Sequence, residues 1–275
     1  MLIAFFLRYL SYFLEPMKKG NIILKYTNFT LNYNVQDHAA VNWHYRLSNY
    51  TKKGVPRPKE FYLDPKLDLE FQQKSTKSYH CGTTNSSKLF YYNYNTFSER
   101  QSTQNTQSPN FGSNYFGNCN GDLYDRGHLV PSTHMNKNVG SRHESHYMTN
   151  ILPQISTLNR GIWLETEQIT GHFAKNNSVE VFGGVIFNDT GNDHFLESHG
   201  VKTPEYFYKI IKIGGNDSFT LSWFIPNKPN LKDLSYYELS VKDINREVEY
   251  NKGEKDINRE VEYNKGEKDI NCEVK

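Results

Sequence analysis

The chain has 275 residues, of which 36% are hydrophobic and 15% aromatic, and its formal net charge is +2. This composition excludes a chain too polar to bury a core, and the length suits one large domain or two small ones. The charge is unevenly distributed, because residues 243–275 hold 7 basic and 10 acidic residues and the other 242 residues carry +5. A mildly basic body of this kind attracts phosphate groups weakly.

The chain begins with an apolar run at residues 1–14, MLIAFFLRYLSYFL, interrupted by Arg8. This run is too short for a comfortable transmembrane helix, and no small-residue cleavage site follows it. We interpret residues 1–22 as a signal or targeting segment, with a buried N-terminal helix as the alternative. Six N-x-[ST] sequons favour a secreted, extracellular protein over the mitochondrial alternative. They lie at Asn28, Asn49, Asn85, Asn176, Asn188 and Asn216.

Residues 21–47 are rich in Ile, Thr, Tyr and Val, a composition typical of strands. The Pro-broken basic loop at residues 52–59 follows, and charged loops of this kind are usually solvated. Residues 74–120 are polar and poor in aliphatic side chains, which predicts a surface loop insertion. Cys81 and Cys119 bracket most of this loop and could form a disulfide that restricts it. A third cysteine would then remain unpaired.

The stretch from Tyr124 to Asn136, YDRGHLVPSTHMN, sets an acid, a cation, a glycine and an imidazole side by side. A neutral His128 can take a proton from water near pH 7. Arg126 keeps its charge and presents a fork that matches phosphate oxygens. Gly127 lets the backbone turn tightly and approach a ligand. These residue types suit chemistry at a phosphodiester, and a surface turn of mixed charge is the alternative.

A second stretch, from Thr149 to Gln168, has apolar residues at helical spacing from Ile155 onward. Asn159 and Glu167 lie off this stripe. Because eight residues of an ideal helix rise about 12 Å, we do not expect both side chains to grip one metal ion. One would bind the ion and the other would hold its water shell. Mg²⁺ suits this arrangement, since it prefers oxygen ligands and retains several waters.

Between these two stretches, His143 and His146 are three residues apart, a spacing that can share one helical face and bind zinc. No cysteine or carboxylate pattern of the zinc type accompanies them. We therefore expect exposed or hydrogen-bonded histidines at both positions instead of a metal site.

The C-terminal third contains three further predicted strands, at residues 179–187, 206–213 and 219–225, separated by Gly and Asn turns. They would build the sheet against which the active-site helix packs. The tail is an internal repeat, because DINREVEYNKGEK occupies residues 243–255 and again 256–268, and a third copy begins after them. With few apolar residues and mixed charge, the later copies should be poorly packed or marginally helical.

Together the two central stretches resemble the DNA/RNA non-specific endonuclease family, the ββα-metal nucleases that include secreted bacterial sugar-non-specific nucleases and mitochondrial endonuclease G. The DRGH string at residues 125–128, with Leu129 and Pro131, matches the family signature. Residues 150–167 are similar to the family pattern N-x-x-P-Q-x-x-x-x-N-x-x-x-W-x-x-x-E. The resemblance implies an α+β fold, in which a mixed or antiparallel central sheet is flanked by helices and carries a ββα-metal active-site motif.

The resemblance also implies roles for the residues that match the family pattern. His128 would be the general base that activates the attacking water. Asn159 would be the single protein ligand of Mg²⁺, with Mn²⁺ as an alternative ion, and Glu167 would orient the water shell of that ion. These three roles define a metal-dependent hydrolysis of phosphodiester bonds.

Two arginines would bind the phosphate: Arg126 within the signature, and Arg57 by a looser match that its lysine neighbours could also satisfy. Asp125 is expected to hold the loop or the arginine and to take no part in proton transfer. Gly127 and Asn150 are likewise expected to support the site structurally. All of these assignments are carried over from the family pattern, position by position.

The sequence therefore predicts a metal-dependent endonuclease that cleaves DNA and RNA without strict sequence specificity. The endonuclease domain would cover residues 23–252, and residues 253–275 would form the repeat tail. The alternative is a catalytically inactive nucleic-acid-binding protein, or an extracellular interaction protein, on the same fold. Besides DNA and RNA as substrates, a homodimer partner is left open, and no stable membrane span is expected.

Overall fold

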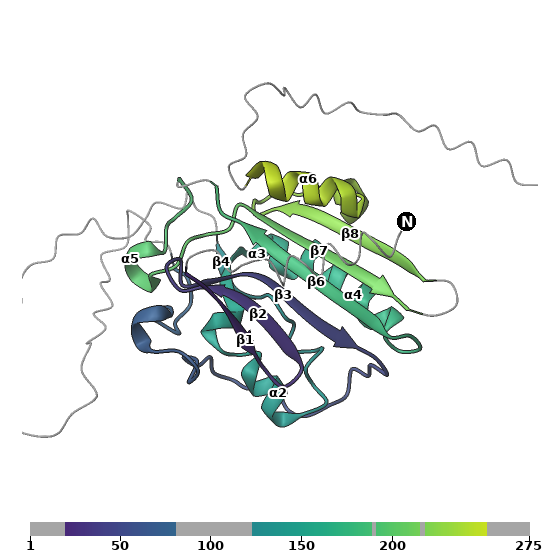
Figure 1. Ribbon diagram of the computed structural model, residues 1–275, viewed down its shortest axis with the longest axis horizontal. Helices are drawn as coiled ribbons and strands as arrows, with labels where there is room; N and C mark the ends of the chain where they lie inside the picture. The colour runs from purple at the N-terminus through teal and green to yellow at the C-terminus, as the bar shows by residue number, and fades with distance from the viewer. Residues whose placement is uncertain (1–19, 81–122, 189–190, 215–217, 252–275) are drawn as a thin grey trace, which may run out of the picture.

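The computed structural model describes residues 20–80, 123–188, 191–214 and 218–251. Its centre is a six-stranded antiparallel sheet in the order β1-β2-β3-β6-β7-β8 (Figure 1), and a second, two-stranded antiparallel sheet pairs β4 with β5. With helices packed against the large sheet, the chain has the predicted α+β architecture. Of the two predicted forms of the central sheet, the structure shows the antiparallel one.

The strands of the large sheet cover the regions that their apolar and β-branched residues predict. They are β1 (Asn21–Lys25), β2 (Phe29–Asn34), β3 (Ala39–Leu47), β6 (Val179–Ile186), β7 (Tyr206–Ile213) and β8 (Phe219–Pro226). The small sheet consists of β4 (Tyr124–His128) and β5 (Ile151–Ile155). In β2 every second residue is buried, so one face of this strand belongs to the core.

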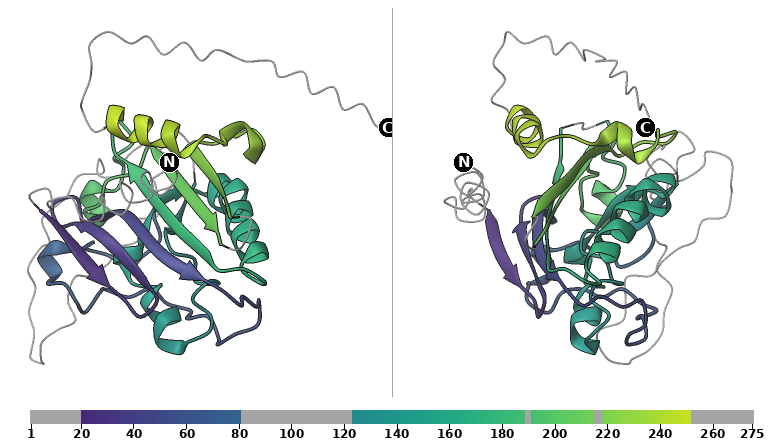
Figure 2. Two further views of the ribbon diagram at one scale, coloured as in Figure 1. Left: turned by 45° about the vertical axis from the view of Figure 1, so that its right-hand side comes forward. Right: turned by 90° about the vertical axis from the view of Figure 1, so that its right-hand side faces the viewer.

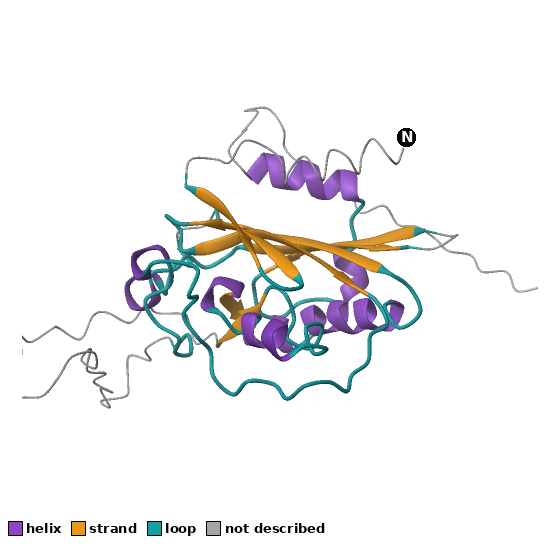
Figure 3. Cartoon of the chain, turned by 60° about the horizontal axis from the view of Figure 1, so that its bottom comes forward, coloured by secondary structure: helices purple, strands orange, loops and turns teal. Residues whose placement is uncertain are grey.

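Helices lie on both faces of the large sheet. They are α2 (Val139–Glu144), α3 (Ser156–Arg160), α4 (Ile162–Phe173), α5 (Leu196–His199) and α6 (Val241–Asn251), with short 3-10 helices at Leu69–Phe71, Met148–Asn150 and Leu234–Tyr237. Helix α6 lies over one face, whereas α2, α3, α4 and the β4–β5 pair lie against the opposite face (Figure 3). The right-hand view of Figure 2 shows α4 and α6 separated by the sheet.

Each face of the sheet has its own hydrophobic core. On one side, Ile244 and Val248 of α6 are buried against Phe182 and its neighbours on β6–β8. On the other side, Trp163 of α4 is fully buried, and its ring lies edge-on to that of Trp43 with 6.3 Å between centroids. Aromatic packing of this kind fixes both the depth and the rotation of α4 on the sheet.

One predicted helix is interrupted. The helical stripe from Ile155 onward predicts a continuous helix, but Ile155 is the last residue of β5, and the helix breaks at Gly161. Gly161 has φ −103° and ψ −118°, which no α-helical residue adopts. Asn159 therefore lies on α3 and Glu167 on α4. The 12 Å separation expected from one ideal helix does not apply to this pair.

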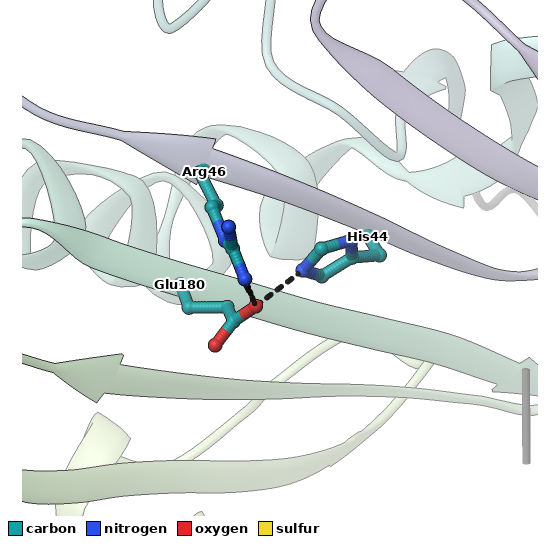
Figure 4. Close-up of polar contacts among 3 residues, drawn as sticks. All are labelled: His44, Arg46 and Glu180. Carbon is teal, nitrogen blue, oxygen red and sulfur yellow. Dashed lines mark hydrogen bonds and ion pairs between the residues drawn. The ribbon is translucent and has the colours of Figure 1, made fainter. Parts of the chain in front are cut away.

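A polar cluster joins β3 to β6 at the middle of the large sheet. Glu180 accepts hydrogen bonds from His44 Nε2 and from Arg46 Nη2, each at 2.9 Å (Figure 4). Burial disfavours the ionised carboxylate, but the bonds from Arg46 and His44 outweigh it and lower the pKa of Glu180. The His44 ring also stacks on Phe182 with 4.6 Å between centroids, so the cluster lies on the α6 face, away from β4 and β5.

Several sequence predictions concern residues outside the described ranges. These are most of the targeting segment at residues 1–22, most of the polar insertion with Cys81 and Cys119, and the repeat tail at residues 253–275. They stay predictions. Within the described ranges, none of the helices combines the length and the apolar character that crossing a membrane requires.

Candidate active site

The DRGH stretch forms strand β4 and not the surface turn of mixed charge that was the alternative. This strand pairs with β5 in antiparallel register along its whole length. Gly127 has a packing reason instead: a Cβ at this position would lie 2.5 Å from Oε1 and 2.6 Å from Cβ of the fully buried Gln154. Only glycine fits so close an approach without displacing a neighbour.

Strand alternation places Arg126 and His128 on the same face of β4, and Phe61 contacts both. The Phe61 ring centroid lies 4.0 Å from Arg126 Cζ and 5.4 Å from the centroid of His128. His146 packs edge-on against His128 with 4.9 Å between centroids. The Nε2 atom of His128 is buried and bonds to none of the described residues. No hydrogen-bond donor among the described residues therefore occupies this nitrogen.

The electrostatics around His128 favour the neutral ring. Burial lowers the pKa of His128 well below its ordinary value, and His146, Arg57 and Arg126 lower it further. Arg126 is itself held in place, because one of its terminal nitrogens donates to the Thr76 carbonyl oxygen at 2.8 Å. At neutral pH the His128 imidazole is thus in the form that accepts a proton.

Asp125 binds the residue that the sequence predicts as the metal ligand. Asn159 Nδ2 donates to Asp125 Oδ2 at 2.9 Å, and Arg160 donates to both carboxylate oxygens, at 2.8 Å and 2.6 Å. Burial opposes ionisation of Asp125, but the hydrogen bonds from Arg160 and Asn159 outweigh it and lower the pKa of Asp125. The ionised carboxylate therefore fixes the orientation of the Asn159 amide.

Helix α4 carries Glu167, and two buried side chains, Lys209 and His134, hold this part of the helix. Lys209 Nζ of β7 donates to Thr166 Oγ1 at 2.6 Å and lies 3.8 Å from the ring centroid of Trp163. His134 Nε2 lies 3.2 Å from the Glu167 carbonyl oxygen, which can only accept, so this nitrogen carries the proton. The backbone of Glu167 and the side chain of its neighbour Thr166 are thus both held in place.

The charges beneath α4 act on the Glu167 carboxylate. Burial raises the pKa of Glu167, and the positive charges of Lys209 and Arg57 lower it again. Conversely, burial lowers the pKa of Lys209, and Glu167 raises it. Each group therefore stabilises the ionised form of the other in surroundings that disfavour both charges.

Asn150 supports the site without facing it. The side chain is fully buried, accepts from the Val130 backbone N–H at 3.0 Å, and donates to the carbonyl oxygens of Val130 and Ser145, both at 2.9 Å. The Asn150 carbonyl oxygen also accepts from Leu129 N at 3.0 Å. These bonds join the end of β4 to the segment before β5.

Arg57 lies in a loop that is tied down and not merely solvated. Val55 N donates to the Asn136 carbonyl oxygen at 2.9 Å, and the Arg142 guanidinium donates to the Val55 carbonyl oxygen. Arg57 Nε in turn donates to His146 Nε2 at 3.4 Å. The structure thereby brings Arg57, from a distant part of the sequence, beside His146, which packs against His128 of the DRGH strand.

The residues present fit a hydrated, hard cation. Because Nδ2 of Asn159 bonds to Asp125, its carbonyl oxygen remains as the donor atom, and an amide oxygen is a ligand that Mg²⁺ accepts. Among the described residues, no three His, Cys, Asp or Glu side chains are grouped so that they could hold an ion between them. The donor set thus fits an ion anchored through one oxygen, with water completing its coordination.

Sequence reasoning missed three residues of this site: Phe61, His146 and Lys209. Phe61 gives no signal in the sequence. His146 was considered only with His143, and it is hydrogen-bonded, as expected, but fully buried beside His128. Lys209 does leave a signal, since a lysine in the apolar run YFYKII must be buried if that strand is central.

Residues 12–256 match a family model described as DNA/RNA non-specific endonuclease. Among solved structures, a chain from the crystal structure of the EndoG/EndoGI complex has a similar fold, with a TM-score of 0.54, 17% sequence identity and 82% of each chain covered. At this identity the likeness concerns the fold alone. None of the curated proteins searched matches the chain.

Proposed function

Because the chain belongs to the DNA/RNA non-specific endonuclease family, and is therefore a nuclease, we propose that it hydrolyses phosphodiester bonds with His128 as the general base. The observation that carries this proposal is the cluster around β4. In it His128 lies beside Arg126 and packs against His146, which in turn accepts a hydrogen bond from Arg57. A neutral imidazole between fixed cations can take a proton from water while the cations hold the phosphate.

We assign phosphate binding to Arg126 and Arg57. The Phe61 ring and the Thr76 carbonyl hold Arg126, and His146 contacts Arg57. Guanidinium groups keep their charge at any working pH and offer two parallel donors to a phosphate. Their positive charges would also stabilise the negative charge that develops on the phosphate oxygens during attack by water.

We assign Asn159 as the anchor of a divalent cation, with Mg²⁺ as the first choice and Mn²⁺ as the alternative. Such an ion supplies positive charge that stabilises the developing charge on the phosphate and on the leaving oxygen. Asp125 orients Asn159 through the bond to its amide nitrogen. Glu167 would hold the ion's water shell.

We further propose that β4, β5 and the helices that follow form the ββα unit of the family, within an endonuclease domain at residues 23–252. Helix α6 contains the start of the first repeat copy, and its buried Ile244 and Val248 support a domain end after this helix. A homodimer and the cellular compartment stay predictions.

The proposal is tested by nicking of supercoiled plasmid DNA, and by cleavage of RNA, with Mg²⁺ and with EDTA. We expect cleavage of both polymers, dependent on the metal. His128→Ala should lower the rate by about 10²- to 10⁴-fold, the usual contribution of a general base, while DNA binding persists. Asn159→Ala should remove the metal-dependent activity, and His172→Ala, at an exposed position of α4, serves as the control. Full activity of His128→Ala, or undiminished turnover in EDTA, would refute the assigned chemistry.

A further inference from the structure

We propose that His146 is a positioning residue that holds Arg57 in place for phosphate binding, by accepting a hydrogen bond at Nε2. This inference rests on the proposed role of Arg57. It concerns a side chain that faces away from solvent, on the segment between α2 and β5. Arg57 itself is exposed and comes from a distant loop, so something must hold its guanidinium if the arginine is to bind in one orientation.

The hydrogen bonds of His146 determine which nitrogen carries the proton. His146 Nδ1 lies 3.0 Å from the Arg142 carbonyl oxygen, and a carbonyl oxygen can only accept. Nδ1 therefore carries the hydrogen, and Nε2 is left with a lone pair. Arg57 Nε, which can only donate, lies 3.4 Å from this Nε2. The two hydrogen bonds therefore form a relay with one direction: Arg57 donates to the His146 imidazole, and the imidazole donates to the Arg142 carbonyl oxygen.

The surroundings of His146 keep the ring neutral, as this relay requires. The residue is fully buried and packs against the rings of Phe61, at 5.2 Å, and His128, at 4.9 Å, between centroids. Burial lowers the pKa of His146 to about 4, and the charges of Arg57 and Arg142 act in the same direction against the bond to the Arg142 carbonyl. A protonated ring would turn a donor toward Arg57 and place two positive charges side by side.

Arg142 holds the same loop by a second route. Its guanidinium donates to the Val55 carbonyl oxygen and, at 3.3 Å, to Ser132 Oγ. Its own carbonyl oxygen accepts from His146. One residue of α2 thus anchors the backbone of the loop two positions before Arg57 and orients the imidazole that contacts the Arg57 side chain.

The arrangement selects how Arg57 presents its charge. A guanidinium has five N–H donors, of which one belongs to Nε and four to the terminal nitrogens. Because His146 engages Nε, the two terminal nitrogens remain for a phosphate, which they can bind end-on with two parallel bonds. Arg57 without this contact would keep its charge but sample several rotamers, and ordering it would then weaken substrate binding.

The test is a double-substitution cycle with His146→Phe and Arg57→Ala. Phenylalanine keeps the ring packing but removes the acceptor. Binding of a short DNA duplex is measured in EDTA, where no cleavage occurs, and KM and kcat are measured with Mg²⁺. We expect His146→Phe to weaken DNA binding and raise KM about tenfold, near the lower limit for a hydrogen bond to a charged group, with a smaller change in kcat. His146→Gln, which returns an acceptor, should restore part of the loss.

The cycle separates the possible outcomes. If His146 acts through Arg57, His146→Phe has no further effect on binding in the Arg57→Ala background. Additive losses, or normal binding by a folded His146→Phe enzyme while Arg57→Ala is impaired, overturn the inference alone. Normal binding by Arg57→Ala overturns the proposed role of Arg57, and the inference with it. His143→Phe, on α2 but stacked on Tyr62, is the matched control, and thermal melting verifies that each variant folds.

Discussion

Replacing Lys209 by methionine removes a buried charge beneath Glu167 while nearly conserving the volume of the side chain. In the native enzyme, Lys209 Nζ bonds to Thr166 Oγ1, one residue before Glu167, and its charge lowers the pKa of that carboxyl against the effect of burial. Without this charge, burial acts with less opposition. The pKa of Glu167 should therefore rise, and the ionised carboxylate that we assign to the site should require a higher pH.

The size of this shift follows from the geometry. An opposite charge within about 4–6 Å typically changes a carboxyl pKa by 1–3 units. Among the ion pairs within 4.0 Å in the described residues, none joins Lys209 to Glu167, so we take the lower end, about one unit or about 1.4 kcal/mol. A carboxyl group with a raised pKa is protonated at a higher pH, so activity is lost at a higher pH. The acid limb of the kcat/KM profile should therefore move toward higher pH by about one pH unit. On that limb the rate at a fixed pH falls about tenfold.

The measurement is a profile of kcat/KM against pH for cleavage of a DNA duplex with saturating Mg²⁺. Lys212→Met, on the same strand but on the opposite face of the sheet by strand alternation, controls for the loss of one positive charge. An unshifted acid limb in a folded Lys209→Met enzyme would refute the electrostatic reasoning. Equal loss of activity at every pH would show that Lys209 only supports the packing of α4.

Three further outcomes are expected. Gly127→Ala would place a methyl group 2.5 Å from Gln154 Oε1, so it should destabilise the fold by about 1–3 kcal/mol, seen as a lower melting temperature together with lost activity. Asp125→Asn weakens the hold on Asn159, and the Mg²⁺ concentration for half-maximal activity should rise about tenfold or more, the usual effect of losing a residue that orients a metal ligand. Ile244→Ala should cost about 2–5 kcal/mol by cavity formation, while DNA affinity at a temperature below the transition stays unchanged.

The sequence pattern was sufficient to predict those strands whose structure depends mainly on residues close together in the chain. The strands at residues 179–187, 206–213 and 219–225 were predicted to within one residue at each end, because alternation, β-branched residues and turn residues all act over short distances. The DRGH signature was not predicted as a strand, and the surface turn considered as its alternative is wrong. Its extended form depends on pairing with β5, more than twenty residues later, and Gly127 is required by the distant Gln154.

The contacts that position the site could not be derived from spacing. The bond between Arg57 and His146 spans 89 positions in sequence, and nothing around either residue indicates the other. The helical stripe gave no warning of the break at Gly161, because apolar residues recur at similar intervals on both sides of it. Lys209 belongs to a strand that was predicted correctly, but its partner helix was needed to show what the buried charge faces.

Burial and nearby charges shift the pKa values of His128 and Glu167 in opposite directions. Burial and the charges near His128 lower its pKa well below its ordinary value, so the ring is already neutral where Glu167, with its pKa raised by burial, begins to ionise. The acid limb of activity should therefore report Glu167 and not the base. A very weak base is a poor one, however. A phosphate bound by Arg57 and Arg126 brings negative charge next to the ring, which offsets those cations and raises the pKa of His128 when substrate is present. The cations that hold the substrate thus keep the base unprotonated in its absence and strengthen it on binding.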